Sequence, residues 1–229
     1  MSKARTVIAW LVTAAVCAAA SDLDKYRDRQ DRPALEKSVA DFTRAAQQAP
    51  NDADAQYRLA LASSYLAEVA LEVRDKAQAQ RVAETGVQAA EHAIALRKDV
   101  AEYYRVLGTL CGQVIPANVL GGLGYGKRAR DAIAKALELD PKSAKAYLAR
   151  GVGNYYLPPA LGGGAELAIR DFERALELDG KSADTYLWLG LALRKANRNA
   201  DARRAFARSL ELDPERVWTK QQLEKTPAQ

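Results

Sequence analysis

Hydrophobic residues recur at helical spacing along most of this 229-residue chain, and leucine and alanine supply most of them. Three stretches repeat one pattern of apolar and charged positions: ALELDPKSAKAYLARG (136–151), ALELDGKSADTYLWLG (175–190) and SLELDPERVWTKQQL (209–223). Leu-Asp-Pro ends one helix and begins the next, because proline is tolerated in the first turn of a helix but not in its interior. The pattern predicts a soluble, helix-rich protein made of repeated helix pairs.

The clearest unit extends from Ala183 to Pro214. Gly190 and Ala202 are small where two paired helices would need to approach closely, and bulky apolar residues surround them. The unit resembles the tetratricopeptide repeat through Tyr186-x2-Leu189-Gly190-x2-Leu193, Ala202-x3-Phe206 and Pro214. The resemblance implies an all-α, right-handed superhelical solenoid of antiparallel helix pairs, with about four repeats and capping helices.

Earlier units are longer than this one. The positions equivalent to Pro214 are separated by 48, 43, 39 and 34 residues, and they are Pro50, Lys98, Pro141, Gly180 and Pro214. A regular unit has about 34 residues, so the first three units carry insertions between their two helices. The first insertion lies in a stretch without glycine or proline (55–85), and we expect it to lengthen both helices, with a break near Arg74–Ala77.

The second and third insertions resemble each other, since Pro116–Gly122 and Pro159–Gly163 both run from proline to paired glycines. Because they occupy equivalent places, we expect them side by side on one edge of the solenoid. In the third, Tyr155 and Tyr156 should end a helix, prolines should stop it, and Gly162–Gly164 should let the chain reverse.

The first twenty residues have the layout of a secretory signal peptide. Lys3 and Arg5 precede an apolar stretch, Thr6 to Ala20, that ends in three alanines and is too short to cross a bilayer comfortably. We expect export to the periplasm or cell envelope, with no stable transmembrane segment after cleavage. A lipoprotein acylated at Cys17 is the alternative, but the residues before this cysteine match that motif poorly.

The predicted organisation has three parts: a signal peptide (1–20), an N-terminal linker (21–31) and a tetratricopeptide solenoid (32–225). The solenoid comprises an opening helix (32–49), repeats at about 53–98, 101–141, 144–180 and 183–214, and a polar capping helix (215–225) anchored by Leu223.

Charge and cysteine content change this picture little. The net charge of +5 would fall to +3 with the loss of Lys3 and Arg5, a weak basis for nucleic-acid binding, and we expect none. Loss of Cys17 would leave only Cys111, so no internal disulfide is expected. Small neighbours suggest that Cys111 is a buried structural thiol.

No residues form a convincing catalytic or cofactor site. The glycine-rich GGLGYGK (121–127) lacks the preceding strand and the following Ser or Thr of a phosphate-binding loop, so we expect its glycines to serve a compact turn. His92, the sole histidine, has no companions at metal-ligand spacing. We therefore expect no metal, no cofactor and no enzyme, although a hidden site at the insertions is a third possibility.

In a tetratricopeptide array the first helices line a concave groove, at positions 2, 5, 9, 12 and 13 of each repeat. By resemblance, the groove residues here are Tyr57, Leu61, Tyr65, Arg105, Leu148, Val152, Tyr155, Tyr156, Leu187, Leu191, Arg194 and Lys195. Thr109 also falls at such a position. The Lys and Asn by which some family members grip chaperone C-termini are missing from positions 5 and 9, so that activity is not implied.

A groove of tyrosine and leucine with basic residues at one end fits an apolar peptide or helix with an acidic flank. We expect a non-enzymatic protein-interaction scaffold of the cell envelope, whose partner surface includes the groove and the Pro/Gly-Gly insertions. The alternative is a transport-accessory protein that binds a small apolar ligand or lipid, as a monomer or as an oligomer. The sequence does not determine the oligomeric state or the partner.

Overall fold

The computed structural model describes residues 22–117 and 122–228, and every regular element in these ranges is helical. The α-helices are α2 (Leu23–Asp28), α3 (Arg32–Gln48), α4 (Ala53–Glu72), α5 (Lys76–Leu96), α6 (Ala101–Val114), α7 (Gly122–Leu139), α8 (Ala144–Tyr156), α9 (Ala165–Leu178), α10 (Ala183–Lys195), α11 (Asn199–Leu212) and α12 (Val217–Glu224). A short 3-10 helix, η1 (Pro159–Leu161), lies between α8 and α9. The all-α prediction is confirmed.

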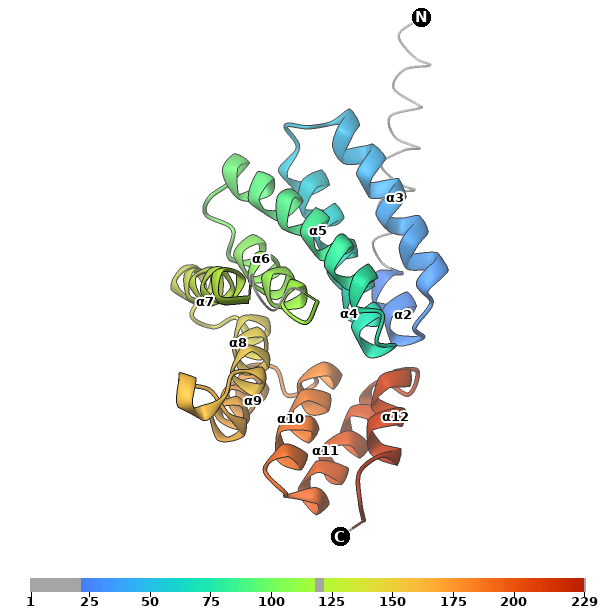
Figure 1. The fold of residues 1–229 in the computed structure, drawn as a ribbon, viewed down its shortest axis with the longest axis vertical. Helices are drawn as coiled ribbons and strands as arrows, with labels where there is room; N and C mark the ends of the chain where they lie inside the picture. The colour runs from blue at the N-terminus through green and yellow to red at the C-terminus, as the bar shows by residue number, and fades with distance from the viewer. Residues whose placement is uncertain (1–21, 118–121, 229) are drawn as a thin grey trace, which may run out of the picture.

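Consecutive helices pack as antiparallel pairs: α4 with α5, α6 with α7, α8 with α9, and α10 with α11 (Figure 1). The pairs stack in chain order, so the fold is the tetratricopeptide solenoid that the sequence predicts. The stack curves until α12, at its C-terminal end, lies near α2 and α4 at its N-terminal end (Figure 1). The two ends of the solenoid therefore touch.

Small residues at the predicted positions allow the helices of each pair to approach closely. A Cβ atom added to Gly190 would lie 2.6 Å from Cε1 of Phe206, and one added to Gly151 would lie 2.7 Å from Cδ1 of Phe172. Both rings are fully buried. Each phenylalanine of a second helix thus packs onto the glycine of its partner helix, which explains the Gly and Ala-x3-Phe pattern of the sequence.

The first repeat has the lengthened helices expected from its insertion. Helices α4 and α5 have 20 and 21 residues, against 13 and 14 in α10 and α11. The turn between α4 and α5 contains Arg74 with φ of 67°. The side chain of Asp75 then accepts a hydrogen bond from the backbone of Gln78, which stabilises the start of α5.

Residues 23–28 form α2, so the prediction of a linker over 21–31 is wrong there. Leu23 is 1% exposed and joins the apolar core of α3 and α4 with Leu35 and Phe42. Helix α2 has only six residues, too few for a periodic hydrophobic pattern, and tertiary packing stabilises it.

The glycine-rich stretch before Lys127 is also not the compact turn that we expected. Gly122, Gly124 and Gly126 lie in the first turns of α7, and positive φ angles among the described glycines occur only at Gly162 and Gly164. Part of the second insertion, 118–121, lies outside the described residues. Its proximity to the third insertion stays a prediction.

The third insertion is built as its sequence indicates. Helix α8 ends at Tyr156, and Leu157 and Pro158 are extended before η1. Gly162 and Gly164 have φ angles of 83° and 112°, which L-residues rarely adopt, so these glycines let the chain turn into α9.

Candidate binding surface

The predicted groove residues of α4 contact their own chain. Tyr57, Leu61 and Tyr65 are half-buried. The hydroxyl of Tyr57 donates to Oε1 of Glu102 (3.2 Å), and that of Tyr65 donates to Oδ1 of Asp24 (2.7 Å). Burial raises the pKa of both phenols, and the carboxylates that accept their hydrogen bonds add to this rise, against the opposing effect of nearby arginines. These tyrosines join α4 to α6 and α2.

The apolar groove positions of α8 and α10 belong largely to the core. Leu187 and Leu191 are 0% and 4% exposed, and Leu148 and Val152 pack half-buried against the same cluster. The prediction of an exposed lining is therefore wrong for Leu187 and Leu191. The reason is that α10 packs against α9 and α11, and to a smaller extent against α8, and these helices together bury both leucines.

Two of the predicted basic groove residues are bound internally. The Arg105 side chain is 14% exposed and donates from Nε and Nη2 to Glu102, both at 2.7 Å. Arg194 donates to the backbone oxygen of Gln222 (3.2 Å), to its Oε1 (2.7 Å) and to Oγ1 of Thr226 (3.1 Å). The Arg105 ion pair lies within α6, and the hydrogen bonds of Arg194 fix α12 to α10.

Four rings meet where α8, α10 and α12 come together, and we call Tyr155, Tyr156, Trp188 and Trp218 the aromatic cluster. Their centroids are separated by 5.0 Å (Tyr155 to Tyr156), 5.8 and 6.0 Å (each tyrosine to Trp188) and 5.4 Å (Trp188 to Trp218), all edge-to-face. Lys195 lies 4.5 Å from the ring centroid of Tyr155 and donates to its carbonyl oxygen. Tyr156 is 66% exposed, whereas the other three rings are half-buried, so it is the most accessible member.

Sequence analysis missed Trp188 and Trp218. Trp188 is one residue beyond a predicted groove position, and Trp218 lies on the helix that we expected to be a polar cap. The signal was available, because only 7% of the chain is aromatic and only three residues are tryptophan. Such rings on otherwise polar helix faces indicate packing or binding.

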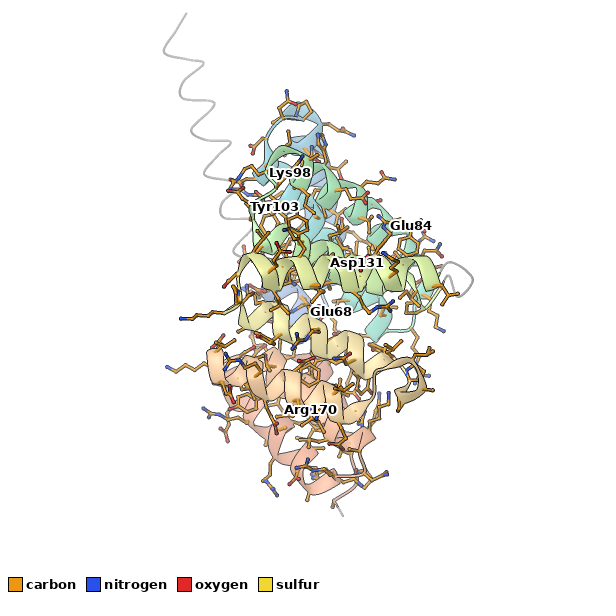
Figure 2. All side chains as sticks on the ribbon, turned by 90° about the vertical axis from the view of Figure 1, so that its left-hand side faces the viewer. Glu68, Glu84, Lys98, Tyr103, Asp131 and Arg170 are labelled. Carbon is orange, nitrogen blue, oxygen red and sulfur yellow. The ribbon has the colours of Figure 1, made fainter. Side chains whose placement is uncertain are left out.

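A second cluster joins the two ends of the solenoid. We call it the ionic cluster: Arg27, Asp28, Glu68, Glu72, Asp184 and Arg216. Nη2 of Arg216 lies 2.6 Å from Oε1 of Glu68, and Nη1 of Arg27 lies 2.8 Å from Oδ2 of Asp184. Arg216, just before α12, is 1% exposed, so a charged residue of the predicted polar cap is buried instead of facing solvent. Glu68 lies near the middle of the molecule (Figure 2).

The ionic cluster holds four carboxylates and two guanidiniums, and this imbalance affects ionisation. Burial raises the pKa of Glu68 to about 7 and that of Asp28 to about 6, against the opposing effect of the arginines. Burial also raises the pKa of Glu72. Burial acts on Asp184 in the same direction, but Arg27 and Arg216 outweigh it and lower its pKa. A substantial fraction of Glu68 is therefore protonated and uncharged near neutral pH.

The described residues contain no cluster of three or more His, Cys, Asp or Glu that could hold a metal ion. Cys111 is free and buried, and burial raises the pKa of its thiol to about 11, which keeps it protonated at neutral pH. His92 is exposed on α5. None of the helices over 22–117 and 122–228 is long and apolar enough to cross a membrane.

Paired helices with a curved inner face define a tetratricopeptide-repeat protein, a class whose members are generally non-enzymatic interaction scaffolds. Comparison with family models agrees, because residues 183–216 match the tetratricopeptide repeat. Residues 19–157 match the model described as "Regulator of microtubule dynamics protein 1-3", and the chain belongs to this family.

Similar solved structures share the fold. A thermophilic tetratricopeptide protein of Thermus thermophilus has a TM-score of 0.63 at 20% identity, over 84% of this chain and 90% of that one. The HusA haemophore from Porphyromonas gingivalis has a TM-score of 0.63 at 19% identity, over 80% and 93%. Among curated protein sequences, none matches this chain.

Proposed function

We propose that this chain binds a protein or peptide partner through the aromatic cluster and the adjoining η1 segment. Solenoids of stacked repeats offer extended concave surfaces to partners. The observation that carries the proposal is the exposure of Tyr156 (66%) and of Leu161 in η1 (65%). Exposed aromatic and aliphatic side chains of this size are typical anchors of protein interfaces.

Hydrogen bonds hold the segment that presents these side chains. The amide of Gly164 donates to the carbonyl oxygen of Asn154 (2.8 Å), and that of Gly163 donates to Pro158 (3.1 Å). Gly163 is buried against Leu157 and leaves no space for a Cβ atom. A surface already ordered before binding loses less conformational entropy in the complex.

The proposal is tested by affinity capture of native partners with the tagged full-length chain, followed by mass spectrometry. Tyr156→Ala and Leu161→Ala should each deplete the specific partners about tenfold, the loss expected when an anchor residue is truncated. Leu96→Ala is the matched control, since Leu96 is exposed at the end of α5, which carries neither a residue of the Pro/Gly-Gly insertions nor a member of the aromatic cluster. Equal recovery by all four proteins would overturn the proposal.

Localisation decides which partners are reachable. The N-terminal pattern supports export with cleavage after Ala20. The family description instead suggests microtubules as a partner, and an exported protein would not contact them. Fractionation and the mass of the mature N-terminus separate the two. Retention of residues 1–20 and co-sedimentation with microtubules would favour the second.

The ligand-carrier alternative has weaker support. The haemophore among the similar structures shares only the fold, and the contact between the two ends of the solenoid is charged rather than apolar. Native mass spectrometry distinguishes the two functions, because a carrier would retain a bound small molecule.

A further inference from the structure

The aromatic cluster and the ionic cluster adjoin through the buried Arg216. We call the accessible side chains on either side of it the joint surface: Tyr156, Glu68 and Asp184. The guanidinium of Arg216 lies 5.8 Å from the ring centroid of Trp218 and 2.6 Å from Glu68. From Trp218 the ring contacts continue to Trp188 and on to Tyr156. Tyr156 is 66% exposed, but partial desolvation of its phenol still raises the pKa, and Glu68 and Glu72 add to this rise, so the phenol lies within their field.

Around the joint surface, carboxylates outnumber the cationic side chains that face them. The four carboxylates of the ionic cluster face two guanidiniums of the chain itself, and the Lys145 ammonium adds a weaker attraction at Asp184. Two of the carboxylate side chains remain reachable. The side chains of Glu68 and Asp184 are 22% and 29% exposed, whereas that of Glu72 is 2% exposed. A cation from outside would therefore be attracted to the Glu68 side of the surface.

The basic residues that suggested an acidic partner do not compete with this interpretation. Arg194 is hydrogen-bonded to Gln222 and Thr226, and Lys195 covers Tyr155. These positive charges serve the packing of α12 and the end of α8. The surface beside them combines exposed rings with carboxylates, which is the chemistry that recognises a cation.

We propose that this surface binds an arginine or lysine side chain of a partner peptide, stacked on Tyr156 and Trp188 with its charge directed at Glu68. Arginine fits best, because its planar guanidinium stacks on aromatic faces and pairs with carboxylates. The inference rests on the proposed function and assigns the partner's chemistry: a basic segment, in contrast to the acidic flank that the sequence suggests.

Proton linkage provides an independent readout. The groups that face Glu68 are Arg27 of α2, Arg216 before α12, Glu72 of α4 and Asp184 of α10. With its pKa near 7, Glu68 is partly protonated at neutral pH. A bound cation favours the ionised form, so affinity for a basic peptide should fall as the pH drops below about 7.

The test uses fluorescence anisotropy with the full-length chain at pH 8 and three labelled peptides of alternating leucine and a variable residue. The variable residue is arginine, its neutral analogue citrulline, or glutamate. The arginine peptide should bind about tenfold more tightly than the citrulline peptide. Tyr156→Ala and Glu68→Gln should each remove about that advantage. Leu96→Ala and Glu173→Gln are controls, because both residues are exposed on helices, α5 and α9, that contribute nothing to the two clusters. Circular dichroism checks that each variant is folded.

The wild-type protein at several pH values keeps the proposal testable if Glu68→Gln does not fold. Tighter binding of the glutamate peptide, or equal binding of the arginine and citrulline peptides, would overturn the basic-partner proposal. Absence of any binding by the arginine peptide would overturn it as well. These results concern only the charge of the partner and do not affect the capture experiment. The proposed binding surface itself would be overturned only if the wild type and the Tyr156→Ala and Leu161→Ala variants recovered native partners equally.

Discussion

Gly151 and Gly153 lie two residues apart on α8 and have different surroundings. A Cβ atom on Gly151 would lie 2.7 Å from Cδ1 of Phe172, whereas one on Gly153 would contact nothing within 4 Å. The sequence predicts the first position from repeat spacing. It gives no comparable reason for the second glycine.

This pair makes a matched test of the packing. Gly151→Ala should lower the free energy of unfolding by about 1–3 kcal/mol, because overpacking outweighs the better helix propensity of alanine. Gly153→Ala should raise it by up to about 1 kcal/mol through that propensity alone. Urea unfolding followed by circular dichroism measures both. A stabilising effect at both positions would show that the α8–α9 contact is looser than described.

Some helices can be predicted from the sequence and others cannot. The repeats from α4 to α11 are predicted because each carries periodic apolar residues, and α4, α5, α8 and α10 also begin with a capping Asp or Ser. Helix α2 is not, since six residues show no period and its burial depends on distant helices. The ionic cluster and the two tryptophans of the aromatic cluster were missed for the same reason, whereas Tyr155 and Tyr156 were predicted as groove residues. Their members come from separate repeats, and only the curvature of the stack brings Arg216 to Glu68.

Helix α7 allows the glycine-rich stretch to be tested. Gly124 is exposed within α7, and a Cβ atom there would contact nothing within 4 Å. Gly124→Ala should therefore stabilise the protein by up to about 1 kcal/mol, measured by urea unfolding. If residues 122–126 instead formed a turn that requires positive φ, the same substitution would destabilise it.

At the scale of the whole molecule, Arg216 joins the two ends of the solenoid. Arg216→Met should lower the free energy of unfolding by about 3–5 kcal/mol, because it leaves Glu72, whose side chain is 2% exposed, without its paired guanidinium. Arg208→Met is the control: Arg208 pairs with Glu211 on the surface of α11, and its loss should cost less than about 1 kcal/mol. Equal effects of the two variants in urea unfolding would contradict the contact between the ends.

The ionic cluster also predicts how stability depends on pH. Glu68 and Asp28 have pKa values of about 7 and about 6 in the folded protein, and both acids titrate near ~4 when unfolded. The folded state then holds more protons, so the free energy of unfolding should fall as pH rises from about 4 to about 7. Carboxyls with lowered pKa values, such as Glu102, act below this window.

Comparison of urea midpoints at pH 5 and pH 8 measures this dependence. Glu68→Gln removes one of the two groups and should flatten the profile by on the order of 1 kcal/mol. An unchanged profile in the variant would mean that Glu68 titrates normally in the folded protein.

Contact between the ends also has a consequence for how the chain completes its fold. Most solenoid contacts are local, so a repeat can form as soon as it has been synthesised. Here Arg216 bonds residues 144 to 189 positions earlier, including Glu72 and the carbonyl oxygen of Arg27. The buried Glu72 therefore gains its paired guanidinium only after residue 216 has been synthesised. A chain that stops before residue 216 would leave its first repeat without this ion pair, so the first repeat completes its contacts only after α10 and α11 have been made.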